Sequence, residues 1–372
     1  MSTSFLDTVL ELESFDFDRQ LEKVTAANVE RALRRDEQLD RRDLLCLLAP
    51  AAQPYLEEMA RKARQLTLQH FGRIISLYAP LYISDYCANA CTYCGFHAGV
   101  DFPRTTLTLA QIEQEAAAIA ATGIRHILVL TGEAPAQTPI SYLADAVRLL
   151  TEHFSSIALE IFPLDEAEYR TLREAGADSL TVYQETYNRE TYKEVHPRGK
   201  KADYVYRLHT PERGARAGFR ALNIGPLFGL AEPRREAWLA ALHARWLEDS
   251  FPDVEISLSL PRMTKAAGAI PPRHILPDKD FVQFMLAWRL FMPRLGITIS
   301  TREAPAFRDR LVHLGATRFS SGSKTGVGEY AVRSQEAAPE QFAVTDNRSV
   351  AEVTAMLRRS GYQPVFKDWE LV

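Results

Sequence analysis

The chain has 372 residues, of which 46% are hydrophobic and 25% charged, and its formal net charge is −4. This composition is that of an ordinary globular protein with enough residues to bury a large core. The charge does not suggest a nucleic-acid partner, because binding to phosphates depends on clustered lysine and arginine. The longest apolar stretch, near residues 74–83, is interrupted by Ser76 and Pro80, so we expect no membrane partner.

The amino-terminal segment is acidic, and Arg19 is the only lysine or arginine among the first twenty residues. Export signals and transit peptides have basic segments instead, so we expect a cytoplasmic protein. Residues 1–72 are predicted to form a helical extension with amphipathic runs at Asn28–Arg35 and Pro54–His70. Cys46 lies within the run Leu44–Leu48 and is predicted to be a buried core thiol.

From Arg73 onward, short apolar or β-branched runs alternate with helical runs, which is typical of a parallel sheet built from βα units. One of these helices, Leu109–Thr122, begins with a capping box from Thr108 to Gln111. The predicted strands are Ile74–Ser84, His126–Thr131, Ser156–Pro163, Ser179–Gln184, Arg220–Phe228, Val254–Leu260, Ile297–Thr301 and Thr317–Ser321.

Eight such units predict an α/β protein with a (βα)8 TIM-type barrel over residues 73–325, whose chemistry belongs at the carboxyl ends of the strands. Residues 326–372 contain one amphipathic run, Ser349–Arg359, and we expect them to form a short cap on the barrel.

Three of the four cysteines, Cys87, Cys91 and Cys94, follow the first predicted strand with the spacing C-x3-C-x2-C. Structural zinc sites use four protein ligands, and ferredoxins usually supply four thiolates to each cluster. Three thiolates without a nearby fourth therefore indicate a 4Fe-4S cluster with one iron left open for a substrate or cofactor. A non-catalytic iron-sulfur or zinc-binding module is the alternative.

The segment Asp85–Phe96, with Tyr93 and Phe96 beside the last cysteine, resembles the radical S-adenosylmethionine enzymes. The resemblance implies that S-adenosylmethionine binds the open iron, that its reductive cleavage yields a 5′-deoxyadenosyl radical, and that Tyr93 and Phe96 contact the cofactor. It also implies a reduced flavodoxin or ferredoxin-type protein as the electron donor.

Later strand ends carry further parts of this resemblance. Thr131-Gly132-Glu133 is similar to the Gly-Gly-Glu segment that receives the cofactor's ammonium group, with Thr131 in place of the first glycine. An ordinary strand-end turn is the competing interpretation of this segment, as a strand-to-helix cap is for Gln184 and Glu185 and a solvated helix arginine is for Arg207. The other residues expected at the cofactor are Glu160 inside the barrel, Gln184 and Glu185 at the ribose, Arg207 at the carboxylate and Leu227 at the adenine.

The segment Ser300-Thr301-Arg302-Glu303 resembles the motif with which aromatic amino-acid lyases of this superfamily hold the substrate carboxylate. An arginine fork can bind a carboxylate through two hydrogen bonds, so Arg302 is the predicted catalytic and substrate-binding residue. Ser321, on the eighth predicted strand, is expected to add a hydroxyl. A structural ion pair from Arg302 to Glu303 or Asp309 is the alternative.

Four matching segments extend the resemblance over most of the chain, at residues 87–96, 182–187, 300–303 and 367–369. They resemble the tyrosine lyases that supply 2-iminoacetate for the thiazole of thiamine. The resemblance implies cleavage of L-tyrosine to 2-iminoacetate and 4-methylphenol, and a partnership with the thiazole synthase subunit. A related enzyme acting on tryptophan or transferring a tyrosine fragment is the alternative. The tyrosine lyases of hydrogenase maturation are disfavoured, because no cysteine follows Cys94.

Overall fold

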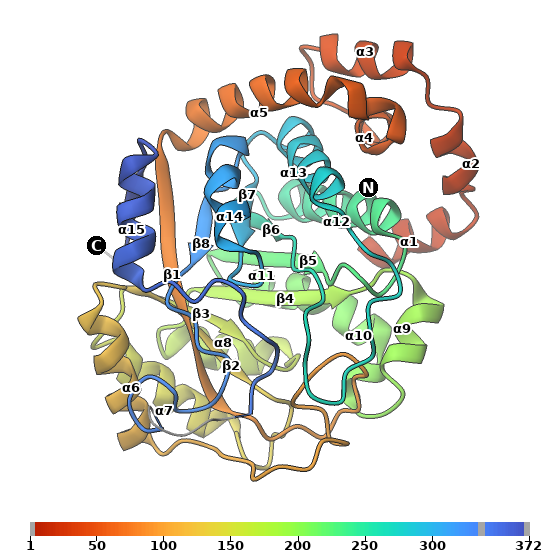
Figure 1. The fold of residues 1–372 in the computed structure, drawn as a ribbon. Coiled ribbons are helices and arrows are strands. Elements are labelled where there is room, and N and C mark those ends of the chain that lie inside the picture. The colour runs from red at the N-terminus through yellow and green to blue at the C-terminus, as the bar shows by residue number, and fades with distance from the viewer. Residues whose placement is uncertain (1–3, 334–338, 368–372) are drawn as a thin grey trace.

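The computed structural model describes residues 4–333 and 339–367. Eight parallel strands close into a barrel, because β1 pairs with β2 on one side and with β8 on the other (Figure 1). The predicted (βα)8 fold is therefore confirmed. The barrel strands are β1 (Ile74–Ser84), β2 (His126–Thr131), β3 (Ser156–Glu160), β4 (Ser179–Glu185), β5 (Ala221–Pro226), β6 (Glu255–Ser259), β7 (Gly296–Ile299) and β8 (Arg318–Ser320).

Helices follow the strands along the chain and surround the barrel (Figure 1). Because the helices cover the outer face and side chains fill the interior, strands such as β5 are buried at every position. These helices are α6 (Leu109–Ala121), α7 (Ile140–Leu150), α8 (Glu166–Glu174), α9 (Arg189–Val195), η2 (Lys200–Ala202), α10 (Tyr204–Leu208), α11 (Thr210–Arg216), α12 (Pro233–Ser250), α13 (Asp278–Phe291), α14 (Pro305–Leu311) and η3 (Val312–Leu314).

The region before β1 is helical, as predicted, and packs on the outer face of the barrel helices. The Gln283 side-chain amide on α13 donates to the carbonyls of Leu47 and Ala49, at 2.8 Å each. Cys46 is a buried core thiol, as predicted. The elements of this region are α1 (Phe5–Glu13), α2 (Phe17–Glu22), α3 (Ala26–Arg34), α4 (Arg41–Leu48), η1 (Pro50–Tyr55) and α5 (Leu56–Phe71).

Beyond β8 the chain forms α15 (Val350–Arg359) and the short strand β9 (Gln363–Val365). The helix begins with a capping box from Ser349 to Glu352, and β9 adds to the barrel in parallel beside the start of β1. The sequence did not predict β9, because three residues centred on a proline carry no strand pattern. The matching residues Asp368 and Trp369 lie outside the described residues. The domain boundaries at 72 and 325 stay a prediction.

No helix among the described residues is both long and apolar enough to span a membrane.

Candidate active site

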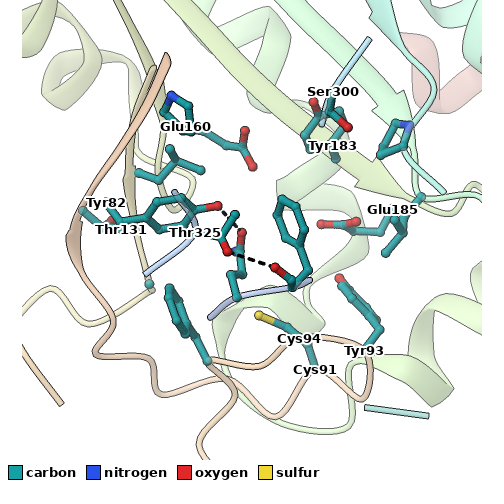
Figure 2. Close-up of a pocket in the computed structure, with 18 of the residues that line it drawn as sticks. Tyr82, Cys91, Tyr93, Cys94, Thr131, Glu160, Tyr183, Glu185, Ser300 and Thr325 are labelled. Carbon is teal, nitrogen blue, oxygen red and sulfur yellow. Dashed lines mark hydrogen bonds between the residues drawn. The ribbon is translucent and has the colours of Figure 1, made fainter. Parts of the chain in front are cut away.

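A cavity opens at the carboxyl ends of the barrel strands (Figure 2). Parallel strands bring their carboxyl ends to one rim, so side chains that are far apart in the sequence meet there. Thirteen residues that the sequence singled out line this cavity: Cys87, Cys91, Cys94, Tyr93, Phe96, Thr131, Gly132, Glu133, Glu160, Glu185, Arg207, Leu227 and Arg302.

Two predicted site residues, Gln184 and Ser321, do not line the cavity. Their side chains are buried, and the amide nitrogen of Gln184 and the hydroxyl of Ser321 have no hydrogen-bond partner. Adjacent strand residues point to opposite faces, so a prediction that is off by one residue moves a side chain out of the barrel. Tyr183 and Glu185 line the cavity on either side of Gln184, and Ser320 lines it next to Ser321, so the roles of Gln184 and Ser321 stay predictions.

The three cysteines lie on the loop that follows β1, and none forms a disulfide. Cys91 is buried, and burial raises the pKa of its thiol to about 12. Among the described residues, no three His, Cys, Asp or Glu side chains are gathered around a single point suited to one metal ion. In a 4Fe-4S cube each thiolate binds a different iron, so the three sulfurs need only border the same space. The cysteine loop fits such a cluster in this respect.

Arg104 holds the cysteine loop in shape, and the sequence did not single it out. Its guanidinium donates to the carbonyl oxygens of Asp85 and Phe96 at 2.6 Å, of His97 at 2.9 Å and of Val100 at 3.1 Å. The guanidinium also stacks on the ring of Phe102, with its central carbon 3.9 Å from the ring centroid. One arginine therefore ties together four carbonyls of a loop without regular secondary structure.

The turn after β2 packs directly against the cysteine loop. A Cβ atom on Gly132 would lie 2.2 Å from the carbonyl oxygen of Tyr86, so only glycine fits at this contact. The side-chain amide of Asn89 donates to Glu133 Oε2 at 2.6 Å, and the carbonyl of Glu133 accepts from the Ala88 N–H at 2.9 Å. These contacts set Glu133 beside the loop of the three cysteines.

Glu185 is held at the end of β4 in an unusual conformation. It is the one residue other than glycine with a positive φ among those described, at 70°, and it follows a break in the register with β5. Its carboxylate accepts from Lys201 Nζ at 2.6 Å and from Arg207 at 3.4 Å. Burial acts to raise the pKa of Glu185, but these two cations outweigh burial and lower it. Strained conformations of this kind are concentrated at functional sites.

Tyr93 forms a buried pair with His196, which the sequence analysis did not identify. Its hydroxyl lies 2.7 Å from Nε2 of His196, and Nδ1 of the same ring lies 2.8 Å from the carbonyl oxygen of Tyr192. Burial lowers the pKa of His196 to about 3, so the ring is neutral near pH 7. Because a carbonyl only accepts, Nδ1 carries the proton and the Tyr93 hydroxyl donates to Nε2.

Arg302 faces the cavity without a carboxylate partner among the described residues. It makes only long contacts, 3.5 Å to the carbonyl oxygen of Arg262 and 3.4 Å to the Thr264 hydroxyl. The two carboxylates that could have paired with Arg302 are bonded to other arginines, Glu303 to Arg262 and Asp309 to Arg348. Its guanidinium is therefore available to an anion that enters the cavity.

The chain beyond β8 supplies part of the cavity wall through Gln341 and Phe342. The Arg302 guanidinium lies 3.3 Å from the centroid of the Phe342 ring, and Gln341 accepts from the Tyr82 hydroxyl at 2.7 Å. Cation–π stacking fixes the plane of the arginine fork. No sequence motif marks these two residues, because they lie in a segment without regular secondary structure.

Family comparisons agree with this geometry. Residues 81–239 match the family described as "Radical SAM superfamily", and residues 259–363 match the "Biotin and Thiamin Synthesis associated domain". A solved structure, that of the FeFe-hydrogenase maturase HydG from Carboxydothermus hydrogenoformans, is 30% identical in sequence. It superposes with a TM-score of 0.90 over 98% of this chain and 86% of that one. Methylornithine synthase (PylB), at 20% identity and a TM-score of 0.73, shares the fold.

Curated relatives match nearly the whole chain. The 2-iminoacetate synthase of Escherichia coli (strain K12) is 42% identical over 99% of this chain and 97% of its own length. The 2-iminoacetate synthase of Salmonella typhimurium is 39% identical over the same shares. The chain therefore belongs to the 2-iminoacetate synthase family of the radical SAM superfamily.

Proposed function

We propose that this chain is a carbon-carbon lyase that cleaves the Cα–Cβ bond of L-tyrosine to 2-iminoacetate and 4-methylphenol, for the thiazole of thiamine. Membership of the 2-iminoacetate synthase family supports this reaction. The observation that carries it is a single cavity lined both by the three cysteines and by Arg302, whose guanidinium has no carboxylate partner among the described residues.

The cofactors of this family are a 4Fe-4S cluster and S-adenosylmethionine. When bound and reduced, they supply the 5′-deoxyadenosyl radical that takes a hydrogen atom from the substrate. We assign Cys87, Cys91 and Cys94 to the cluster. For S-adenosylmethionine we assign the Thr131-Gly132-Glu133 turn to the ammonium group, Arg207 to the carboxylate and Glu185 to the ribose, with Tyr93, Phe96 and Leu227 as walls of the cofactor site.

Two features of the cavity support this assignment. The Thr131 hydroxyl is buried and has no hydrogen-bond partner, although it borders the cavity, so a polar group of a bound ligand can satisfy it. Glu133 and Glu185 are both linked to the cysteine loop through Asn89, whose side chain bonds Glu133 and accepts from the backbone N–H of Lys201 at 3.1 Å. Residues that bind a cofactor at the open iron must lie close to the cysteine loop, and these hydrogen bonds hold Glu133 and Glu185 there.

For the substrate, we propose that Arg302 binds the carboxylate of tyrosine through two parallel hydrogen bonds. Phe342 holds the guanidinium plane, and Ser320 is the hydroxyl on β8 that lines the same cavity. A fixed carboxylate presents the amine, rather than a carbon atom, to the hydrogen-abstracting group, and the barrel walls exclude water from the reactive intermediate.

Substitution of Arg302 tests the substrate site. We expect Arg302→Ala to abolish tyrosine cleavage while leaving the cluster spectrum unchanged, and normal turnover would remove Arg302 from the substrate site. Anaerobic reaction of the reconstituted, reduced enzyme with tyrosine and then tryptophan, with assays for 4-methylphenol and indole products, separates the two substrates. Metal analysis with Cys91→Ala as a control tests the cluster, since bound zinc without iron would contradict radical chemistry.

We also propose two protein partners. A thiazole synthase subunit fits the chemistry, because an imine such as 2-iminoacetate hydrolyses quickly in water and is best transferred directly. A reduced flavodoxin or ferredoxin-type protein fits the need for single electrons. Co-purification and electron-transfer assays test both partners, and the cytoplasmic location stays a prediction.

A further inference from the structure

Glu160 lies at the end of β3 and lines the cavity together with Glu133 and Glu185. Contacts within the protein explain the positions of the other two carboxylates but give no role to that of Glu160. Glu133 is bonded to Asn89, and Glu185 to Lys201 and Arg207. The carboxylate of Glu160 has no hydrogen bond or ion pair with any described residue. Figure 2 shows its carboxylate pointing into the open centre of the cavity, with Glu185 pointing inward from the other side.

The position of Glu160 separates it from the residues assigned to the cofactor. Its strand register places it beside Leu130, and Leu130 lies beside Tyr82 within the barrel. Glu133 and the Lys201–Glu185 pair are connected to the cysteine loop through Asn89, whereas no hydrogen bond or ion pair within residues 4–333 and 339–367 connects the Glu160 side chain to that loop. Although the sequence predicted a cofactor role for Glu160, this geometry favours the substrate.

The charges around Glu160 point to the ligand. The electrostatic influences on its carboxyl come from Glu185, Arg302, Lys201 and Arg207. Lys201 and Arg207 both bond the Glu185 carboxylate. Glu160 and Arg302 are thus an acidic and a basic group that face one cavity and have no ion-pair partner among the described residues. An α-amino acid carries the complementary pair, an ammonium and a carboxylate on one carbon.

We propose that Glu160 binds the α-amino group of the substrate and accepts its extra proton, while Arg302 binds the carboxylate. This inference rests on the proposed function. One proton moves from the ammonium nitrogen to a Glu160 oxygen, which leaves a neutral amine and a neutral carboxylic acid, and no other bond changes. The amine whose hydrogen is abstracted is then held at both ends of the amino-acid group.

The environment of Glu160 suits this proton transfer. Burial, with a further contribution from Glu185, raises the pKa of Glu160 to about 8 despite the opposing effect of Arg302. A carboxyl with such a pKa is more stable in its protonated form near neutral pH than an exposed glutamate is, so a protonated Glu160 beside a neutral amine is the favoured state. The ionised form that takes the proton from the ammonium is populated as the pH approaches 8. The other titratable groups that sense its charge are the hydroxyls of Tyr78, Tyr82 and Tyr183, whose pKa values burial raises, so they stay neutral.

The test uses holoenzyme with an oxidised cluster and S-adenosylmethionine, which does not turn over without a reductant. Tyrosine and 3-(4-hydroxyphenyl)propanoate, which lacks the amine, are titrated into wild type and Glu160→Gln. We expect the substitution to weaken tyrosine binding about 10- to 100-fold, as for a lost hydrogen bond to a charged group, and to change binding of the analogue less than about twofold. Glu160→Asp keeps a carboxylate and should retain part of the preference for tyrosine.

Other outcomes would overturn the inference. Equal weakening of both ligands would mean that Glu160 shapes the cavity without binding the amine. An equally large loss of S-adenosylmethionine affinity would make Glu160 a cofactor residue. Glu248→Gln, a substitution of the same kind on α12 and outside the cavity, is the matched control. If wild type binds tyrosine yet forms no 4-methylphenol when reduced, the proposed function fails, whereas an unchanged preference for tyrosine in Glu160→Gln refutes only the role of Glu160.

Discussion

Replacement of Arg104 by alanine tests whether the cysteine loop is held in shape by the protein before a cluster binds. The substitution removes the hydrogen bonds to the carbonyls of Asp85, Phe96, His97 and Val100. It leaves the three cysteines in place. We therefore expect a chain that folds normally and binds iron less tightly.

The contacts allow a rough magnitude. Each net hydrogen bond contributes about 0.5–1.5 kcal/mol. Because Arg104 is half-buried, the lower part of this range applies, and we expect the loop to lose about 2 to 3 kcal/mol. That loss raises the population of open loop roughly 30- to 150-fold.

The assay is the rate at which a chelator removes iron from the reconstituted enzyme, with iron and sulfide content measured at the start. We expect Arg104→Ala to lose iron faster by about the same factor as the loop opens. Arg104→Lys should behave similarly, because one ammonium group cannot reach four carbonyls. Arg125→Ala is the matched control. Like Arg104, Arg125 donates to backbone carbonyls, two in its case, but it lies just before β2 at the opposite end of the barrel from the cysteine loop. Iron loss at the wild-type rate in Arg104→Ala would refute the reasoning.

Three further predictions follow from single contacts. Gly132→Ala should weaken S-adenosylmethionine binding, measured by titration, because its Cβ would lie 2.2 Å from the Tyr86 carbonyl oxygen; unchanged affinity would contradict this. Asp346→Ala leaves the buried Arg308 without its bonded carboxylate and should cost about 3 to 5 kcal/mol in urea unfolding, whereas a loss below about 1 kcal/mol would mean that Arg308 finds another partner. Burial lowers the pKa of His243 to about 3, so the unfolded state binds the extra proton below about pH 6.5 and stability falls as the pH drops. Wild type should lose about 2 kcal/mol more than His243→Phe between pH 7 and pH 5, and equal losses would contradict the assignment.

Much of the barrel was predictable from local patterns. Alternating strand and helix runs specify parallel βα units, and capping residues such as Thr108 and Asp165 mark where helices begin. All eight barrel strands exist where the sequence predicted them, although several end earlier. The predicted third strand extended to Pro163, whereas β3 ends at Glu160. Strand ends are set by where pairing partners stop, which a single segment does not reveal.

The site was predictable wherever chemistry fixes the residue type at a short spacing. The cysteine triad, the turn before Glu133 and the arginine after β7 all line the cavity because each follows a barrel strand. Gln184 and Ser321 lie outside the cavity lining, because the face of the strand decides which of two neighbouring polar residues points inward, and the sequence does not show that face.

By itself the sequence determined the fold class, the cysteine triad and the family, because these depend on residue type and on short-range spacing. Only the tertiary structure decided which charges remain without a partner. Glu303 and Asp309 bond other arginines, Lys201 neutralises Glu185, and the segment beyond β8 stacks on Arg302. Ion pairing depends on distances between residues remote in the sequence, so the opposed pair of Glu160 and Arg302 becomes visible only when the barrel is closed.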